Sequence, residues 1–191
     1  EGENRLINGH EGVVWVPSEN RFAIVLIRGG DSWDPTRYTE DETYFEYGCD
    51  QADGLFADAA FIGDSVTLKL RNYNTANGAV SGATFLCQGS YSVNHAVNNT
   101  MYLSYQGQDI TPQDALKACG AKKVFILLGM NDIGLWGIDA TIESWGKLIA
   151  NIRQVNPDIQ IYIQSGTPIY KSGEVGSLTN ENMDKYNVKL Q

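Results

Sequence analysis

The chain has 191 residues, of which 42% are hydrophobic and 10% aromatic, which is enough for one well-packed domain and disfavours intrinsic disorder. Its net charge is −9 and it contains no basic run, so nucleic acid and anionic membranes are disfavoured as main partners. No apolar stretch approaches the roughly 20 residues that a membrane-spanning helix needs.

The start of the chain and its cysteines bear on the cellular compartment. The sequence opens with Glu1-Gly2-Glu3 rather than Met, so we expect a trimmed form and favour the cell envelope or exterior over the cytoplasm. Cys49, Cys87 and Cys119 lack the spacing of a metal site. We interpret them as small buried hydrophobic residues, with a disulfide plus one free thiol as the alternative. We predict no metal and no cofactor.

The first 55 residues differ in pattern from the rest of the chain. Two β-type runs, 13–16 and 22–27, flank Pro17-Ser18-Glu19-Asn20, which has the composition of a turn and predicts a hairpin or two strands. An acidic and aromatic stretch, 31–53, follows as a linker or a strap. We therefore divide the chain into a small β-rich extension, 1–55, and an α/β domain, 56–191.

From about residue 57 strands and helices alternate along the chain. Short apolar runs predict buried strands at 59–62 and 124–128, and two further strands are expected at 83–87 and 159–163. Helices are expected after Ser65, after Thr111, after Asp139 and after Thr179, with the last three residues as N-caps. Strands joined through helices imply right-handed crossovers. The fold class is therefore α/β, a three-layer flavodoxin-like parallel sheet.

The first predicted strand ends in Gly63-Asp64-Ser65, which offers a hydroxyl nucleophile. Ligands of open α/β sheets bind at the carboxyl ends of the strands. Gly63 allows a tight turn, and the following helix would direct free N–H groups toward whatever Ser65 attacks. The alternative is that Ser65, or Asp64, only caps the helix.

Two further strand ends carry candidate oxyanion donors. Gly129-Met130-Asn131-Asp132 offers the carboxamide of Asn131, and Gly89 offers a backbone N–H. The alternative for the first segment is an ordinary turn. Asp132 could tune the site, but we interpret it as a solvated turn carboxylate.

Taken together, these segments resemble the SGNH (GDSL-type) hydrolase family over about two-thirds of the chain, from Phe56 to Gln191. The resemblance implies Ser65 as nucleophile, and an oxyanion hole made by the N–H groups of Ser65 and Gly89 with the Asn131 side chain. It implies an esterase that acts on small O-acyl esters, such as acetyl groups on a carbohydrate.

The family's last block, an Asp-x-x-His-like segment, has no counterpart in this sequence. We therefore expect the domain to lack its last strand and its general base, and to be weak or inactive in this form. His95 could act as the base, although an exposed or satisfied loop histidine is the simpler interpretation, and His10 is more remote. A strand-swapped dimer could also complete the site. The oligomeric state is not predicted.

A function of another class stays open, namely a non-catalytic module with a vestigial site. In it the aromatic residues Trp15, Trp33, Tyr38 and Tyr44 would bind a carbohydrate or a protein. Other chemistries are disfavoured. The sequence has neither an Asp-x-Asp pair after Gly63 nor the Gly-Lys-Ser or Gly-Lys-Thr of a phosphate-binding loop.

Overall fold

A computed structural model describes residues 11–16, 21–26, 56–77, 80 and 82–191. The chain divides into two compact units, Glu1–Ala52 and Asp53–Gln191. In the first unit, β1 (Glu11–Val16) and β2 (Arg21–Leu26) pair antiparallel. This pairing confirms the predicted hairpin. The aromatic stretch 31–53 lies outside the described residues.

The second unit alternates strands and helices, as predicted. In chain order its elements are β3 (Ala59–Gly63), α1 (Ser65–Asn77), β4 (Thr84–Cys87), α2 (Val93–Asn98), β5 (Leu103–Tyr105), β6 (Gln108–Ile110), α3 (Pro112–Cys119), β7 (Lys123–Leu127), α4 (Met130–Trp136), α5 (Ile138–Val155), β8 (Gln160–Ile163), the short 3-10 helix η4 (Lys171–Gly173) and α6 (Asn180–Leu190).

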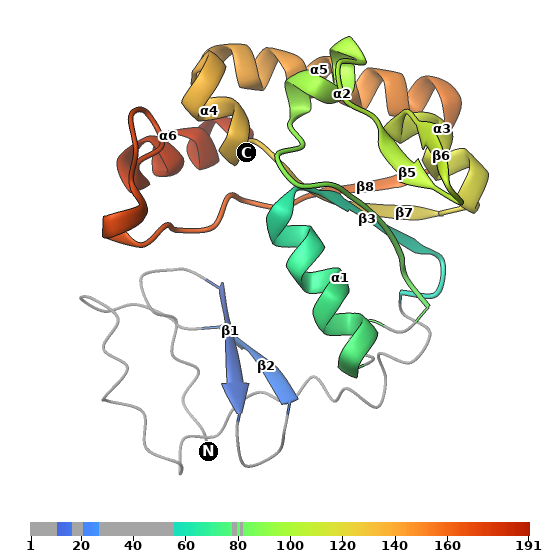
Figure 1. The fold of residues 1–191 in the computed structure, drawn as a ribbon, viewed down its shortest axis with the longest axis horizontal. Helices are drawn as coiled ribbons and strands as arrows, with labels where there is room; N and C mark the ends of the chain where they lie inside the picture. The colour runs from blue at the N-terminus through green and yellow to red at the C-terminus, as the bar shows by residue number, and fades with distance from the viewer. Residues whose placement is uncertain (1–10, 17–20, 27–55, 78–79, 81) are drawn as a thin grey trace. The chain divides into compact units, whose positions relative to one another are not determined.

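The main sheet has the order β4-β3-β7-β8, and each neighbouring pair is parallel. In Figure 1, α1 lies on one side of this sheet and α2, α3 and α5 lie on the other. The predicted three-layer α/β fold is therefore confirmed. The small antiparallel pair β5–β6 was not predicted.

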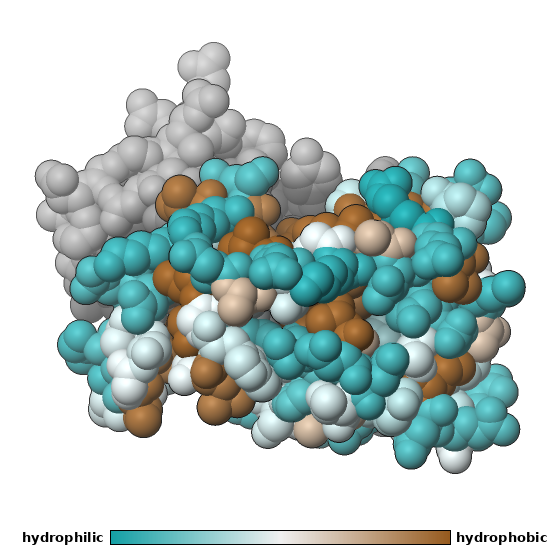
Figure 2. All heavy atoms as spheres, turned by 90° about the horizontal axis from the view of Figure 1, so that it is seen from above, coloured by the Kyte–Doolittle hydropathy of each residue, from teal (hydrophilic) through white to brown (hydrophobic). Residues whose placement is uncertain are grey.

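The two faces of the sheet are covered differently. Toward α2, α3 and α5, side chains such as Ile62, Leu86 and Ile126 are fully buried in the main core. The opposite face carries rings stacked across neighbouring strands, with centroids 4.8–5.3 Å apart: Phe85, Phe61, Phe125 and Tyr162. The surface over the helices of the core side is mostly hydrophilic (Figure 2).

Helix boundaries follow local capping where it exists. Thr111 and Thr179 accept a hydrogen bond from the backbone of α3 and α6, as predicted. The prediction that Asp139 caps α5 is wrong, because that helix begins one residue earlier, after Gly137. Gly137 adopts φ 78° and its carbonyl accepts the Thr141 hydroxyl at 2.7 Å, so Asp139 lies within the first turn.

Candidate active site at the carboxyl edge of the sheet

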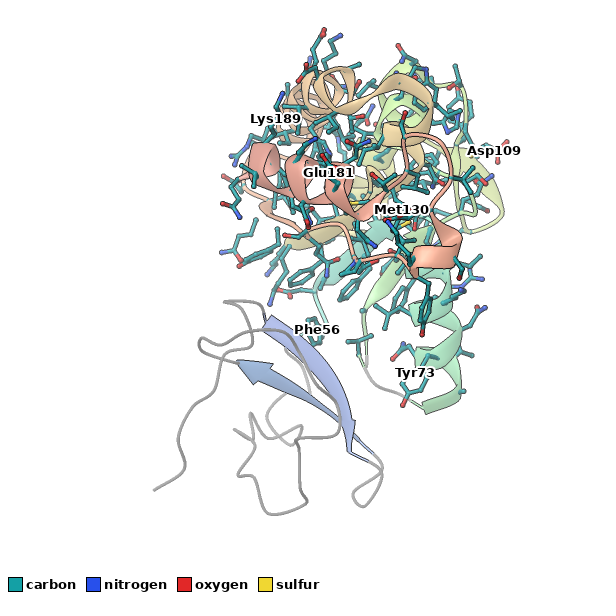
Figure 3. The ribbon with its side chains drawn as sticks, turned by 90° about the vertical axis from the view of Figure 1, so that its left-hand side faces the viewer. Phe56, Tyr73, Asp109, Met130, Glu181 and Lys189 are labelled. Atoms are coloured by element: carbon teal, nitrogen blue, oxygen red, sulfur yellow. The ribbon has the colours of Figure 1, made fainter. Side chains whose placement is uncertain are left out.

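Strand register brings the three predicted site segments to one edge. Gly63 pairs with Cys87 on one side and with Leu127 on the other. Ser65, Gly89 and Gly129 each lie two residues beyond these partners. Adjacent strands are about 4.8 Å apart, so the segments converge. Figure 3 looks toward this edge and labels Met130 of α4 and Glu181 of α6.

Ser65 is the first residue of α1, and its side chain is exposed. The cap is supplied by Asp64 instead, whose Oδ1 accepts the Val66 N–H at 2.9 Å. The main-chain carbonyl of Asp64 accepts the Leu68 N–H at 2.9 Å and so begins the helix. This division of roles leaves the Ser65 hydroxyl without a hydrogen bond to any other described residue, at a helix N-terminus.

Asn131 physically joins the three segments. Its Nδ2 donates to Asp64 Oδ2 at 3.1 Å and to the Tyr91 carbonyl at 2.9 Å. A carboxamide has only two amide hydrogens, so both are engaged within the protein. Asn131 therefore builds the edge, and it could reach an oxyanion only by sharing or releasing one of these bonds.

Gly89 lies in a tight turn after β4. The Tyr91 N–H donates to the Gln88 carbonyl at 3.3 Å, and Ser90 has φ 60°. A positive φ at the third position is typical of a type II turn, where glycine or asparagine is usual. Gly89 is exposed, and its N–H makes no hydrogen bond within the described part of the chain.

The interpretation of Asp132 as a solvated turn carboxylate is wrong. Asp132 lies in α4 and is 0% exposed. Its two oxygens accept the Val93 N–H at 3.0 Å and the Asn94 N–H at 2.9 Å. It thus caps α2 from another helix, a role that the local sequence did not reveal.

Burial raises the pKa of both buried carboxyl groups at this edge, those of Asp64 and Asp132. Burial raises the pKa of Asp64 above its ordinary value, and the charge of Asp132 adds to this rise, whereas the hydrogen bond from Val66 opposes it. Burial also raises the pKa of Asp132, against the hydrogen bonds from Asn94, Val93 and Ser92. The backbone donors therefore offset part of the cost of burying charge at this edge.

His95 is not the loop residue that we expected, because it lies on α2 and is half-buried. Its ring meets Trp136 edge-on at 5.6 Å, and its buried Nδ1 has no hydrogen-bond partner among the described residues. No hydrogen bond joins His95 to Ser65 within that part of the chain. The structure therefore does not pair this ring with the candidate nucleophile.

Gly129, at the start of α4, lies against Tyr186 of α6, a contact that the sequence did not predict. Gly129 has φ 111°, and a Cβ there would overlap the Tyr186 hydroxyl. That hydroxyl donates to the Leu128 carbonyl at 2.9 Å and accepts from Trp145 Nε1 at 2.7 Å. Tyr186 of α6 therefore holds the start of α4 in place, and position 129 requires glycine.

Among the residues that the structure describes, no group of three or more His, Cys, Asp or Glu side chains could hold a metal ion. None of the helices formed by the described residues is both long and apolar enough to span a bilayer.

The fold is shared with solved structures. A GDSL-like lipase from Bacteroides thetaiotaomicron aligns with a TM-score of 0.53 at 13% identity, over 69% of this chain and 60% of its own. A Bacteroides fragilis protein described as an acylhydrolase gives 0.51 at 14% identity, over 69% and 60%. A Streptococcus pneumonia structure described as a platelet activating factor gives 0.50 at 17%, over 73% and 66%.

These likenesses establish the fold of the second unit as that of the SGNH, or GDSL-type, hydrolases. The chain spans 60–66% of the length of these structures. No protein-family model matches the sequence, and no curated protein matches it.

Proposed function

We propose that the second unit hydrolyses acyl esters by a serine-dependent route, with Ser65 as the nucleophile. The observation that carries the proposal is the exposed Ser65 hydroxyl at the start of α1, where Asp64 has taken over the capping role. A fold shared with a GDSL-like lipase and an acylhydrolase supports the same chemistry. Fold alone does not fix function, so the site residues are the test.

The proposed reaction proceeds in two steps. Ser65 Oγ attacks the ester carbonyl carbon, the alcohol leaves with a proton, and the acyl group stays on Ser65. Water then attacks the acyl-enzyme and releases the acid. The N–H groups of Ser65 and Gly89 would hold the oxyanion, and Asn131 would add a donor if it releases one internal bond.

The substrate class that we propose is a small O-acyl ester. The narrower proposal is an O-acetyl group carried by a carbohydrate. No cofactor takes part in this scheme, and the substrate alone supplies the acyl group.

The proposed reaction needs a general base that takes the proton of the Ser65 hydroxyl. Within the described part of the chain, no histidine or carboxylate is hydrogen-bonded to the Ser65 hydroxyl. Loss of the triad histidine costs on the order of 10⁶ in turnover in a serine hydrolase. We therefore expect slow turnover by this polypeptide, measurable only with an activated ester.

The hydrogen bonds of Asn131 favour a second candidate function, a non-catalytic carbohydrate- or protein-binding module with a vestigial site. Both Asn131 amide hydrogens are already engaged, as they would be in a purely structural edge. In this candidate the N-terminal aromatics bind the partner. Trp33, Tyr38 and Tyr44 lie outside the described residues, and Trp15 is described only as part of β1.

The test compares p-nitrophenyl acetate hydrolysis by the wild type, Ser65→Ala and Ser104→Ala. Ser104 is an exposed serine in β5 and serves as the matched control. We expect Ser65→Ala alone to remove the protein-dependent rate. Equal rates for all three proteins would contradict the esterase proposal and favour the binding module. Release of acetate from an acetylated oligosaccharide then tests the narrower substrate.

A further inference from the structure

We infer that Asp132 is a positioning residue, which fixes the Gly89 N–H for the reaction by holding the segment that follows it. This inference rests on the proposed esterase function. Asp132 touches no reacting atom, so it would act only through the loop between β4 and α2.

Asp132 of α4 caps the start of α2 through both of its carboxylate oxygens. Asp132 is completely buried, and each of its oxygens accepts one backbone N–H from the first turn of α2, at 3.0 and 2.9 Å. The partners are 39 and 38 residues away along the chain. Helix α2 also has its own cap, Ser92, which accepts the His95 N–H at 3.0 Å. A second, remote carboxylate therefore adds attachment to α4 rather than a missing cap.

The second support is that the neighbouring residue holds the same segment. Asn131 donates to the Tyr91 carbonyl at 2.9 Å, so two consecutive residues of α4 engage Tyr91, Val93 and Asn94. We call this set of three bonds the α4 clamp. It fixes the chain directly after Gly89-Ser90.

The third support is a backbone conformation that needs such a clamp. Ser90 adopts φ 60°, which side-chain-bearing residues rarely occupy. Unfavourable conformations persist where the surroundings over-determine them. The α4 clamp begins at Tyr91, the next residue, and it holds the turn that orients the Gly89 peptide.

The turn leaves an unused donor in open space. Gly89 is exposed, nothing lies within 4 Å of where its Cβ would be, and its N–H has no partner among the described residues. A donor aids catalysis only if it is already aimed at the developing charge. If the α4 clamp is loosened, the Ser90 turn should relax and the Gly89 N–H should lose its fixed direction.

The experiment measures kcat and KM for p-nitrophenyl acetate in the wild type, Asp132→Asn and Asp139→Asn, with amide hydrogen exchange over 89–94. Asp139 is an exposed carboxylate in the first turn of α5 and is the matched control. For Asp132→Asn we expect kcat to fall at least about tenfold with KM within about twofold, because the donor is misplaced rather than the substrate site lost. Exchange at Val93 and Asn94 should accelerate.

A rescue separates positioning from general stability. Ser90→Gly added to Asp132→Asn should recover part of kcat, because glycine adopts a positive φ without the steric cost that a serine side chain has there. Should Asp132→Asn fail to fold, Asp132→Glu keeps both acceptor oxygens on a longer side chain and should show a smaller fall confined to kcat.

Two results would overturn the inference separately from the proposed function. The first is an unchanged kcat in Asp132→Asn while Ser65→Ala still removes activity. The second is unchanged exchange at Val93 and Asn94. Equal rates for the wild type and Ser65→Ala would instead overturn the proposed function, and the inference with it.

Discussion

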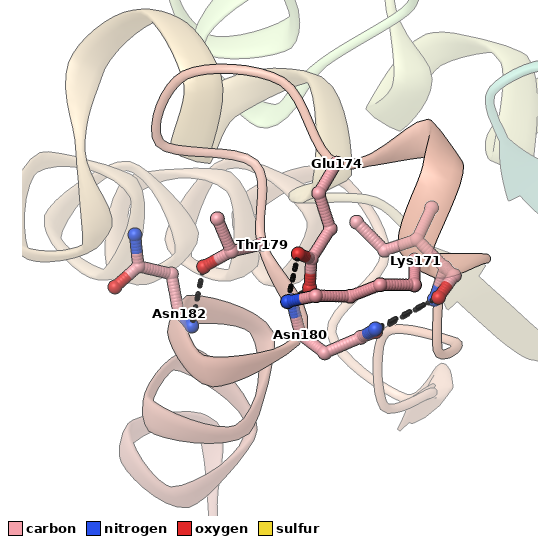
Figure 4. Close-up of polar contacts among 6 residues, drawn as sticks. Lys171, Glu174, Thr179, Asn180 and Asn182 are labelled. Atoms are coloured by element: carbon pink, nitrogen blue, oxygen red, sulfur yellow. Dashed lines mark hydrogen bonds and ion pairs between the residues drawn. The ribbon is translucent and has the colours of Figure 1, made fainter.

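The loops after β4 and β8 both open onto the carboxyl edge, and both are held by asparagine side chains, but in different ways. After β8, Asn187 bonds both the N–H and the carbonyl of Gly166, at 2.8 and 3.0 Å, and Asn180 does the same for Ile169, at 2.8 Å each. Figure 4 shows the neighbouring contacts, where Glu174 accepts the Asn180 N–H and Thr179 accepts the Asn182 N–H.

After β4, the bonds from α4 begin at Tyr91, the last residue of the turn. The α4 clamp engages Tyr91, Val93 and Asn94, whereas the Gly89 N–H has no partner in the described part of the chain and Ser90 has a positive φ. After β8, side chains thus pair both backbone groups of Gly166 and of Ile169, whereas after β4 the Gly89 N–H has no partner among the described residues. Backbone conformations such as that of Ser90 cluster at functional sites in proteins.

The largest expected effect separates the two asparagines that anchor these loops. Asn131→Ala removes bonds to Asp64 and Tyr91, and we expect the p-nitrophenyl acetate rate to fall by about 10²–10³. Asn187→Ala removes bonds to Gly166, and we expect a loss of about 1–3 kcal/mol in unfolding free energy with the rate kept within a few-fold. Steady-state rates and urea unfolding of both variants measure these effects.

The comparison breaks if the two variants behave alike. A rate loss in Asn187→Ala as large as that in Asn131→Ala would mean that the β8 loop also serves the reaction. An unchanged p-nitrophenyl acetate rate in Asn131→Ala would mean that the Asn131 bonds to Asp64 and Tyr91 have only a structural role.

The second prediction concerns the contact that links α4 to α6. Gly129→Ala places a Cβ onto the Tyr186 hydroxyl at φ 111°, and we expect a destabilisation of about 3 kcal/mol from overlap and backbone strain. The control is Gly146→Ala, in the exposed middle of α5 with nothing within 4 Å, which should gain about 0.5–1 kcal/mol. Thermal unfolding of the two variants should therefore shift in opposite directions.

The third prediction concerns the pH dependence of stability, which has opposite signs for Asp64, between β3 and α1, and for Glu174, in the loop after β8. Burial raises the pKa of Asp64, so its contribution to stability is present below the ordinary pKa of about 4 and is lost as pH rises through the raised pKa. The hydrogen bond from Lys171 and that from the Asn180 backbone lower the pKa of Glu174, so its contribution is present above the ordinary value and is lost as pH falls.

Urea unfolding between pH 4 and 7 checks this contrast with Asp64→Asn and Glu174→Gln, since each variant removes one titrating group. Relative to Asp64→Asn, the wild type should lose stability as pH rises. Relative to Glu174→Gln, it should gain stability as pH rises. Parallel trends in the two pairs would contradict the opposite pKa shifts of Asp64 and Glu174.

The smallest effect tests the strain at Ser90. Ser90→Gly relieves a positive φ of 60°, and we expect a gain of up to about 1 kcal/mol in unfolding free energy. Gln106→Gly, at φ 51° in the β5–β6 turn, is a matched control with a similar gain. A loss of stability in Ser90→Gly alone would show that the serine side chain holds the turn.

The sequence predicted those parts of the fold that depend on local signals. Apolar residues marked β3, β4, β7 and β8, and the continuous run in β3 matches a strand that is buried along its whole length. Thr111 and Thr179 marked helix starts because their caps lie within the same segment. Helix α2 escaped prediction, since it is six residues long and Asp132 reaches it from 39 residues away.

The candidate site followed the same rule. Ser65, Gly89 and Asn131 could be placed together because each follows a predicted strand. The engagement of both Asn131 hydrogens and the burial of Asp132 depend on tertiary packing that no local pattern encodes. Side chains that bond across segments therefore account for most of what the sequence did not reveal.

The central claim is that the Ser65 hydroxyl receives an acyl group. Brief exposure to p-nitrophenyl acetate, followed by acid quenching, digestion and mass spectrometry, locates any acetyl group on the chain. We expect one acetyl group on the peptide that contains Ser65, absent from Ser65→Ala and retained in Ser104→Ala. Acetylation that spares Ser65, or that is equal in Ser65→Ala, would contradict the account.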